Sequence, residues 1–73
     1  MFEMRAVEDA ILVAQAGGGF TMTASAKRTE DLVPIARAAA GSGAKITFTG
    51  LEMRRMEDLV MIARAGQGTV SFA

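Results

Sequence analysis

The sequence predicts an α/β fold built from three tandem units, each consisting of a helix, a glycine turn and a strand. An acidic pair recurs three times along the 73 residues, at Glu8-Asp9, Glu30-Asp31 and Glu57-Asp58. Each pair is followed by an apolar segment, a glycine pair and a short stretch that alternates apolar residues with Thr or Ser. Self-similarity at a spacing of about 20 to 30 residues is the signature of a repeat architecture.

The apolar segment after each acidic pair predicts a helix. In the middle unit Leu32, Ile35, Ala36 and Ala39 recur at i, i+3, i+4 and i+7, which places them on one helical face. The same face repeats in the outer units, at Ala10, Val13 and Ala14 and at Leu59, Ile62 and Ala63. Two acidic residues in the first turn complement the positive end of the helix dipole. Thr29 is the expected N-cap of the middle helix.

A glycine pair follows each predicted helix, at Gly17 and Gly19, at Gly41 and Gly43, and at Gly66 and Gly68. Glycine adopts the left-handed backbone that ends a helix without a steric cost from Cβ. The glycine motifs that bind phosphate stand instead between a strand and the following helix, so that the helix N-terminus faces the phosphate. Because the order here is reversed, the glycines predict helix caps and indicate no nucleotide cofactor.

A short alternating segment closes each unit and predicts a strand, at residues 20–23, 46–49 and 70–72. Alternation makes one sheet face apolar and gives the other a row of hydroxyl groups. Helical crossovers imply parallel pairing with right-handed connections. The simplest architecture is a three-stranded parallel sheet in the order 1-2-3, with helices on the apolar face, in a short solenoid-like fold; the order 2-1-3 stays open. We expect one domain over residues 1–73, with units at approximately residues 1–23, 24–49 and 50–73.

The recurring string Asp-Leu-Val-x-Ile-Ala-Arg-Ala, followed by glycine and a short strand, resembles helix–strand repeat segments of small uncharacterised bacterial proteins. The resemblance covers Glu30–Gly50 and Glu57–Ala73 well and Glu8–Ala24 more loosely. The unit also has the size and α/β geometry of a leucine-rich repeat, although the consensus Asn or Cys position is absent. The resemblance implies an α/β repeat protein and no known activity.

The composition excludes several kinds of chemistry. The chain has no His and no Cys, so a disulfide framework, a thiolate nucleophile, an imidazole base and a Cys-based zinc site are all missing. Eight basic residues balance eight acidic residues, which argues against a binder of nucleic acid or anionic membranes. A membrane helix needs about 18 apolar residues in a row, and the apolar runs of this chain are far shorter. We therefore expect no enzyme activity, cofactor, metal, nucleic acid or membrane, and by default a cytoplasmic location.

Two surfaces are candidates for binding. The first is the hydroxyl-bearing face with the exposed edge of the last strand, which a second sheet or another protein could cover, although Thr is also a residue that strands favour. Its residues are Thr21, Thr23, Thr47, Thr49, Thr69, Val70, Ser71 and Phe72. The second is a basic row for an anion or an acidic partner, formed by Arg5, Arg28 and Arg55 where strands lead into helices. The favoured alternative is that each Arg pairs with acids of a neighbouring unit.

The ends of the repeat array indicate self-association. Fourteen of the apolar residues are Ala, so the core is thin for a chain of this length. An isolated solenoid needs polar outer units as caps, yet Val7 and Met56 stand in the outer units where the middle unit has Thr29. The six Met residues either fill gaps in the core, which we favour, or form apolar ends. The sequence predicts a homo-oligomer; the alternative is a small regulatory binder or inhibitor of another protein, such as an immunity-like or phage-encoded adaptor.

Overall fold

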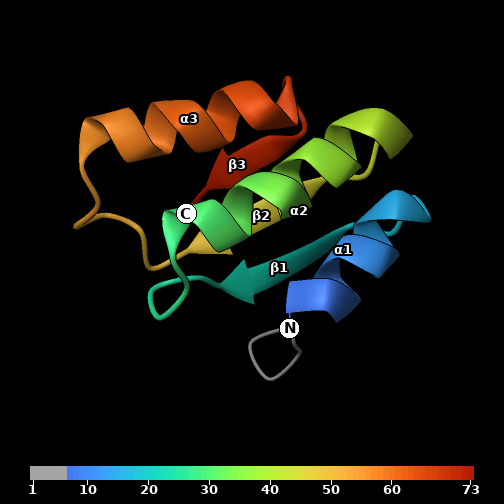
Figure 1. Ribbon diagram of the computed structural model, residues 1–73, viewed down its shortest axis with the longest axis horizontal. Coiled ribbons are helices and arrows are strands. Elements are labelled where there is room, and N and C mark those ends of the chain that lie inside the picture. The colour runs from blue at the N-terminus through green and yellow to red at the C-terminus, as the bar shows by residue number, and fades with distance from the viewer. Residues whose placement is uncertain (1–6) are drawn as a thin grey trace.

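Three helices and three strands alternate along residues 7–73, which are the residues that the computed structural model describes (Figure 1). The helices are α1 (Val7–Gln15), α2 (Thr29–Ser42) and α3 (Met56–Gly66), and the strands are β1 (Phe20–Thr23), β2 (Ile46–Thr49) and β3 (Val70–Phe72). The predicted order of helix, glycine turn and strand is therefore confirmed in all three units. None of these helices combines the length and the apolar character needed to cross a membrane.

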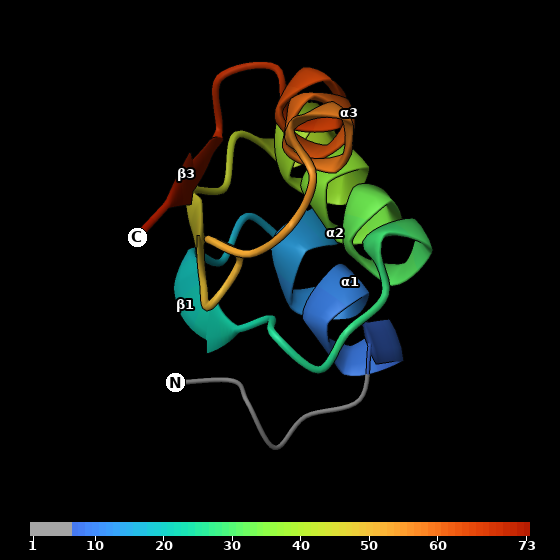
Figure 2. The ribbon, with the colours of Figure 1, turned by 90° about the vertical axis from the view of Figure 1, so that its left-hand side faces the viewer.

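The three strands form a parallel sheet in the order β1-β2-β3. Their register follows the repeat, since Phe20 pairs with Ile46 and Ile46 pairs with Val70. All three helices lie on one face of this sheet, and α2 lies between α1 and α3 (Figure 2). No helix or strand of residues 7–73 covers the opposite face. This topology decides the strand order, which the sequence left open.

The later two helices begin without a side-chain cap. Arg28 and Arg55 are the N-cap residues of α2 and α3, both in an extended backbone conformation, and neither side chain bonds the helix N-terminus. Thr29 is already the first helical residue, so the expectation that it is the N-cap is wrong. Its hydroxyl group instead accepts a hydrogen bond of 2.9 Å from Nη1 of Arg54. The acidic pairs lie in the first turn of every helix, as predicted.

The helices end in left-handed residues, but the third unit departs from the predicted pattern. Gly43 caps α2 with a φ of 83°. The cap of α3 is Gln67, with a φ of 49°, and Gly68 follows with a φ of 89°. Gly66 is the last helical residue, and a Cβ there would lie 2.5 Å from Cγ2 of Val70. Close packing against β3, and not a left-handed backbone, therefore requires glycine at position 66.

The hydrophobic core lies between the sheet and the helices. Its largest fully buried side chains are Met22, Leu32, Ile35, Ile46, Phe48 and Ile62. The four residues of the predicted apolar face of α2 are all buried, and Ala10 and Ala14 of α1 are buried as well. The same face of α3 differs, because Leu59 is half-buried and Ala63 is exposed. The expectation that Ala63 lies in the core is therefore wrong.

Arg54 connects the third unit to the loop that precedes α2. Its guanidinium donates to the carbonyl oxygens of Ala24 at 3.2 Å and Ser25 at 3.5 Å. It also donates to the carbonyl oxygen of Lys27, in addition to the hydroxyl group of Thr29. Loop carbonyls outside helices and sheets need other partners, and the planar guanidinium can donate to several of them at once. Polar contacts therefore join neighbouring units in addition to the core.

Candidate interaction surface

The hydroxyl-bearing face of the sheet lies on the side away from the helices (Figure 2). Thr21, Thr47 and Ser71 are neighbours across the three strands, and Thr23 is the neighbour of Thr49. Oγ1 of Thr47 lies 2.9 Å from Oγ of Ser71, and Oγ1 of Thr49 donates to Oγ1 of Thr23 at 3.5 Å. Four of these five hydroxyl groups, all except that of Thr21, therefore have a hydroxyl neighbour across the strands.

The hydroxyl group of Thr69 has a hydrogen-bond partner in the turn before β3. It precedes β3, and its hydroxyl group donates to the carbonyl oxygen of Gly66 at 2.6 Å. Its own carbonyl oxygen accepts the N–H of Ile46 at 2.9 Å. The Thr69 side chain therefore also closes the turn after α3.

The outer edge of β3 carries unpaired backbone groups. In a parallel ladder alternate residues bond the neighbouring strand. The N–H of Ala73 bonds the carbonyl oxygen of Phe48 at 3.0 Å, and the carbonyl oxygen of Thr69 bonds Ile46, so residues 69, 71 and 73 face β2. The backbone groups of Val70 and Phe72 point the other way and have no partner within residues 7–73. This edge is therefore open to pairing with another strand.

Two of the three residues of the predicted basic row form ion pairs within their own units, and the third lies outside the described residues. Arg5 lies outside the described residues. Arg28 lies 3.4 Å from Asp31 and Arg55 lies 3.6 Å from Asp58, so each pairs with an acid of its own helix. The expected pairing with acids of a neighbouring unit is wrong for both. The two Arg side chains are 72% and 76% exposed, and ion pairs of this kind contribute little to stability.

Identical residues at equivalent positions of the second and third units differ in burial. The three pairs are Leu32 and Leu59, Ala36 and Ala63, and Phe48 and Phe72. The first member of each pair is fully buried. The second member is half-buried in the case of Leu59 and exposed in the other two, with 40% of Phe72 exposed. The second unit has the third unit packed beside it, through α3 on α2 and β3 on β2, and the third unit has no such neighbour on its other side within residues 7–73.

The free side of α3 carries an apolar stripe of Met56, Val60 and Ala63, which we call the outer stripe. These residues are spaced at i, i+4 and i+7 and therefore lie on one side of the helix. Met56 is 69% exposed and Val60 is 40% exposed. The equivalent residues of α2 are Thr29, Val33 and Ala36, and those of α1 are Val7, Ile11 and Ala14. All six of these equivalents are half-buried or buried.

Sequence reasoning anticipated an apolar end at Met56 but missed Ala63, which it placed in the core by analogy with Ala36. Met56 replaces Thr29 at the start of the last helix, where an outermost unit would be expected to become more polar.

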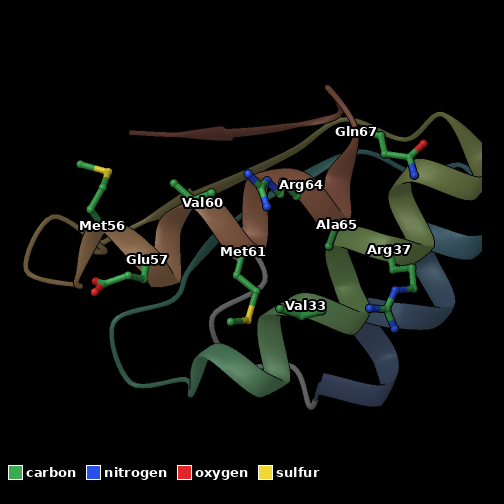
Figure 3. Close-up of a pocket in the computed structure, with 9 residues that line it drawn as sticks. All are labelled: Val33, Arg37, Met56, Glu57, Val60, Met61, Arg64, Ala65 and Gln67. Atoms are coloured by element: carbon green, nitrogen blue, oxygen red, sulfur yellow. The ribbon is translucent and has the colours of Figure 1, made fainter.

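A groove of about 820 Å³ lies along the outer surface of α2 and α3. Figure 3 shows Met61 of α3 pointing toward Val33 of α2, whereas Met56 and Val60 point to the other side of α3. Arg37 also lines this groove and is exposed. The groove therefore extends from the contact between α2 and α3 over the outer surface of α3, and Met56 and Val60 of the outer stripe are among the residues that line it.

The methionines of residues 7–73 fall into two groups, whereas Met1 and Met4 lie outside the described residues. Met22 is fully buried, as expected of a residue that fills the core. Met53, Met56 and Met61 are 94%, 69% and 52% exposed. The core-filling interpretation is therefore wrong for these three, all of which belong to the third unit.

No three acidic side chains of residues 7–73 lie close enough together to hold a metal ion. Comparison of the chain with protein-family models, with curated proteins and with solved structures found no match. The interpretation of these surfaces therefore depends on their geometry.

Proposed function

We propose that this protein is a non-enzymatic interaction module, a short solenoid that associates with copies of itself through the exposed end of its repeat array. The observation that carries this proposal is the outer stripe of α3, which leaves in solvent the positions that are half-buried or buried on α1 and α2, each of which has a following helix. A solenoid that remains monomeric has polar residues on its terminal units. Because Met56 and Val60 are apolar, covering them with another chain gains hydrophobic free energy that the monomer leaves unused.

The size of the molecule sets the strength of such an association. The molecule measures 29 × 25 × 19 Å, so one end of the array offers only a few hundred square ångströms to a partner. Interfaces that bury less than about 1,200 Å² in total are typical of weak and transient complexes. We therefore expect a dissociation constant in the micromolar to millimolar range.

Sedimentation equilibrium over a concentration range of about 10 μM to about 1 mM tests this proposal, since the range brackets the expected affinity. The weight-average mass of the wild-type chain is expected to rise with concentration. A Val60→Lys variant is expected to stay closer to the monomer mass, because a charge in the outer stripe would be buried by association. A wild-type chain that keeps the monomer mass over the whole range contradicts the proposal.

The groove between α2 and α3 favours a second candidate function, a small regulatory binder or inhibitor of another protein. An apolar floor with Arg37 and Arg64 at its sides suits an amphipathic segment that carries acidic residues. For this function the chain is expected to be monomeric and to lose a specific partner in a Met61→Lys variant. A partner that binds the Met61→Lys and wild-type chains equally would count against it.

A further inference from the structure

We infer that the copies associate head-to-tail, with the free end of the third unit of one copy against the free end of the first unit of the next. This inference rests on the proposed function and names the partner of the outer stripe as a second copy of this chain. The contacts between units within one molecule supply the geometry, because the same residue positions recur at both ends.

The first unit presents the matching half of the contact. Leu12 on α1 is 62% exposed and Ala16 is exposed. The residues equivalent to Ala16 are Ala38 and Ala65, which are both half-buried and pack against the core. On α3, the residue equivalent to Leu12 is Met61, which points toward α2, the preceding helix (Figure 3). Leu12 and Ala16 therefore occupy the positions by which a helix meets the one before it, and α1 has no preceding helix within residues 7–73.

The backbone of the sheet repeats one hydrogen bond from unit to unit. The N–H of Phe20 bonds the carbonyl oxygen of Lys45 at 3.1 Å, and the N–H of Ile46 bonds that of Thr69 at 2.9 Å. Gly19 is the residue of the first unit that is equivalent to Lys45 and Thr69. In the proposed contact, the N–H of Val70 therefore bonds the carbonyl oxygen of Gly19 of the next copy. The outer edge of β3 thus pairs in parallel with the outer edge of β1.

The pairing of β3 with β1 of the next copy also brings α3 beside α1 of that copy, so that their apolar side chains meet. The outer stripe of α3 lies on the side that α1 and α2 use to contact the following helix. In the next copy, Leu12 of α1 and Ala16, the residue that follows α1, take the place that Met61 and Ala65 take against α2. The contact buries Ala63 at its centre, as Ala36 is buried within the molecule. One chain therefore carries both halves of a self-complementary surface.

A head-to-tail dimer and a two-fold dimer differ in the surfaces that stay free to bind a further copy. A two-fold dimer uses the same patch on both copies and leaves the other end of each copy unused. A head-to-tail contact leaves one unused end of each kind, so that further copies add until a ring closes or a filament forms. Blocking one end at a time distinguishes these two arrangements.

Two variants block the two ends separately. Ala63→Lys places a charge in the outer stripe, and Leu12→Lys places a charge at the free end of the first unit. Both positions are exposed in the monomer, and Lys is a good helix former, so the fold is expected to persist. The two new charges have the same sign, so the blocked ends do not attract each other. Thr47→Lys is the matched control, because it adds the same charge to the central strand, on the sheet face away from the helices (Figure 2).

Sedimentation velocity of each variant alone and of their equimolar mixture is the test. Each blocked variant alone is expected to associate at least about tenfold more weakly than wild type, and Thr47→Lys is expected to associate like wild type. The mixture is expected to form one-to-one dimers that grow no further. In these dimers the open outer stripe of the Leu12→Lys chain meets the open first unit of the Ala63→Lys chain.

Other outcomes overturn the inference, and they separate it from the proposed function. If Leu12→Lys associates like wild type and Ala63→Lys does not, the contact is two-fold and self-association stands without the head-to-tail arrangement. If both variants associate like wild type, the contact lies elsewhere on the molecule. If wild type itself is monomeric at millimolar concentration, both proposals fail. Circular dichroism checks each fold, and Val60→Lys with Ala16→Lys is the second pair if either first variant is unfolded.

Discussion

The guanidinium of Arg54 donates a hydrogen bond of 2.9 Å to the hydroxyl group of Thr29, and this bond joins the start of the third unit to the start of α2. The same side chain also donates to loop carbonyls of the second unit. Lys27 stands at the equivalent position of the second unit. Contacts between units are therefore not only apolar, and the hydrogen bonds of Arg54 are suited to fixing the register of one unit against the next.

Removal of the Arg54 side chain is expected to destabilise the fold. Arg54→Ala leaves the carbonyl groups of Ala24 and Lys27 without this donor, and we expect a loss of about 1–3 kcal/mol in the free energy of unfolding. Urea denaturation at one low protein concentration measures this loss. Arg55→Ala is the matched control, because Arg55 forms only an exposed ion pair at 3.6 Å and is expected to change stability by less than about 1 kcal/mol. Equal losses of unfolding free energy for the two variants would show that the hydrogen bonds of Arg54 contribute no more to stability than the exposed ion pair of Arg55.

The two helical glycines at positions 41 and 66 are expected to respond to alanine in opposite directions. Gly66→Ala forces a Cβ to within 2.5 Å of Cγ2 of Val70, and overpacking of this kind costs about 1–3 kcal/mol. A Cβ at Gly41 meets no atom within 4 Å, so Gly41→Ala is expected to stabilise α2 by about 0.5–1 kcal/mol. Thermal and urea unfolding of both variants give the comparison. A stable Gly66→Ala protein with an unmoved β3 would refute the packing argument.

The hydroxyl-bearing face is expected to be dispensable for association. Thr47→Lys removes the hydrogen bond to Ser71 and places a charge at the centre of this face. If the copies meet end to end, the dissociation constant is expected to change by less than about threefold, because the new side chain remains in solvent. Analytical ultracentrifugation of the Thr47→Lys chain beside wild type measures it. Complete loss of association would instead assign the interface to the sheet face.

The dependence on salt distinguishes an apolar contact from one made by the basic row. Raising the NaCl concentration from about 0.1 M to about 1 M shortens the screening length from about 10 Å to about 3 Å. Association through the outer stripe is expected to weaken by less than about threefold or to become stronger, since apolar burial does not depend on screening. A contact made by Arg28 and Arg55 with acids of another copy would weaken much more. Sedimentation at the two salt concentrations decides between them.

The repeat made most of the fold predictable from the sequence. The strands were predicted correctly from the alternation in Phe20–Thr23 and Ile46–Thr49. The buried face of α2 was predicted correctly from the helical spacing of Leu32 and Ile35. Local errors arose where one side chain interacts with a neighbouring unit. Thr29 was expected to be a cap because its contact with Arg54, 25 residues away in the chain, leaves no local signal.

The candidate surface was only partly predictable. The open edge of β3 followed from its position as the last strand, and the row of hydroxyl groups followed from alternation. The exposure of Ala63 did not follow, because the sequence around it is nearly identical to that around Ala36, which is fully buried. Burial at this position is decided by the presence of a following unit, and that is a property of the whole array rather than of the local sequence.

Amide hydrogen exchange of β3 at two protein concentrations tests the central claim most directly. The N–H groups of Val70 and Phe72 point away from β2, whereas residues 71 and 73 face β2 and provide the control. End-to-end association through β3 predicts that protection of the Val70 and Phe72 amides rises by at least about tenfold between mostly monomeric and mostly associated samples. The control amides are expected to change little, since their bonds form within one copy. Equal exchange of Val70 and Phe72 at both concentrations, in a sample shown to be associated, would contradict it.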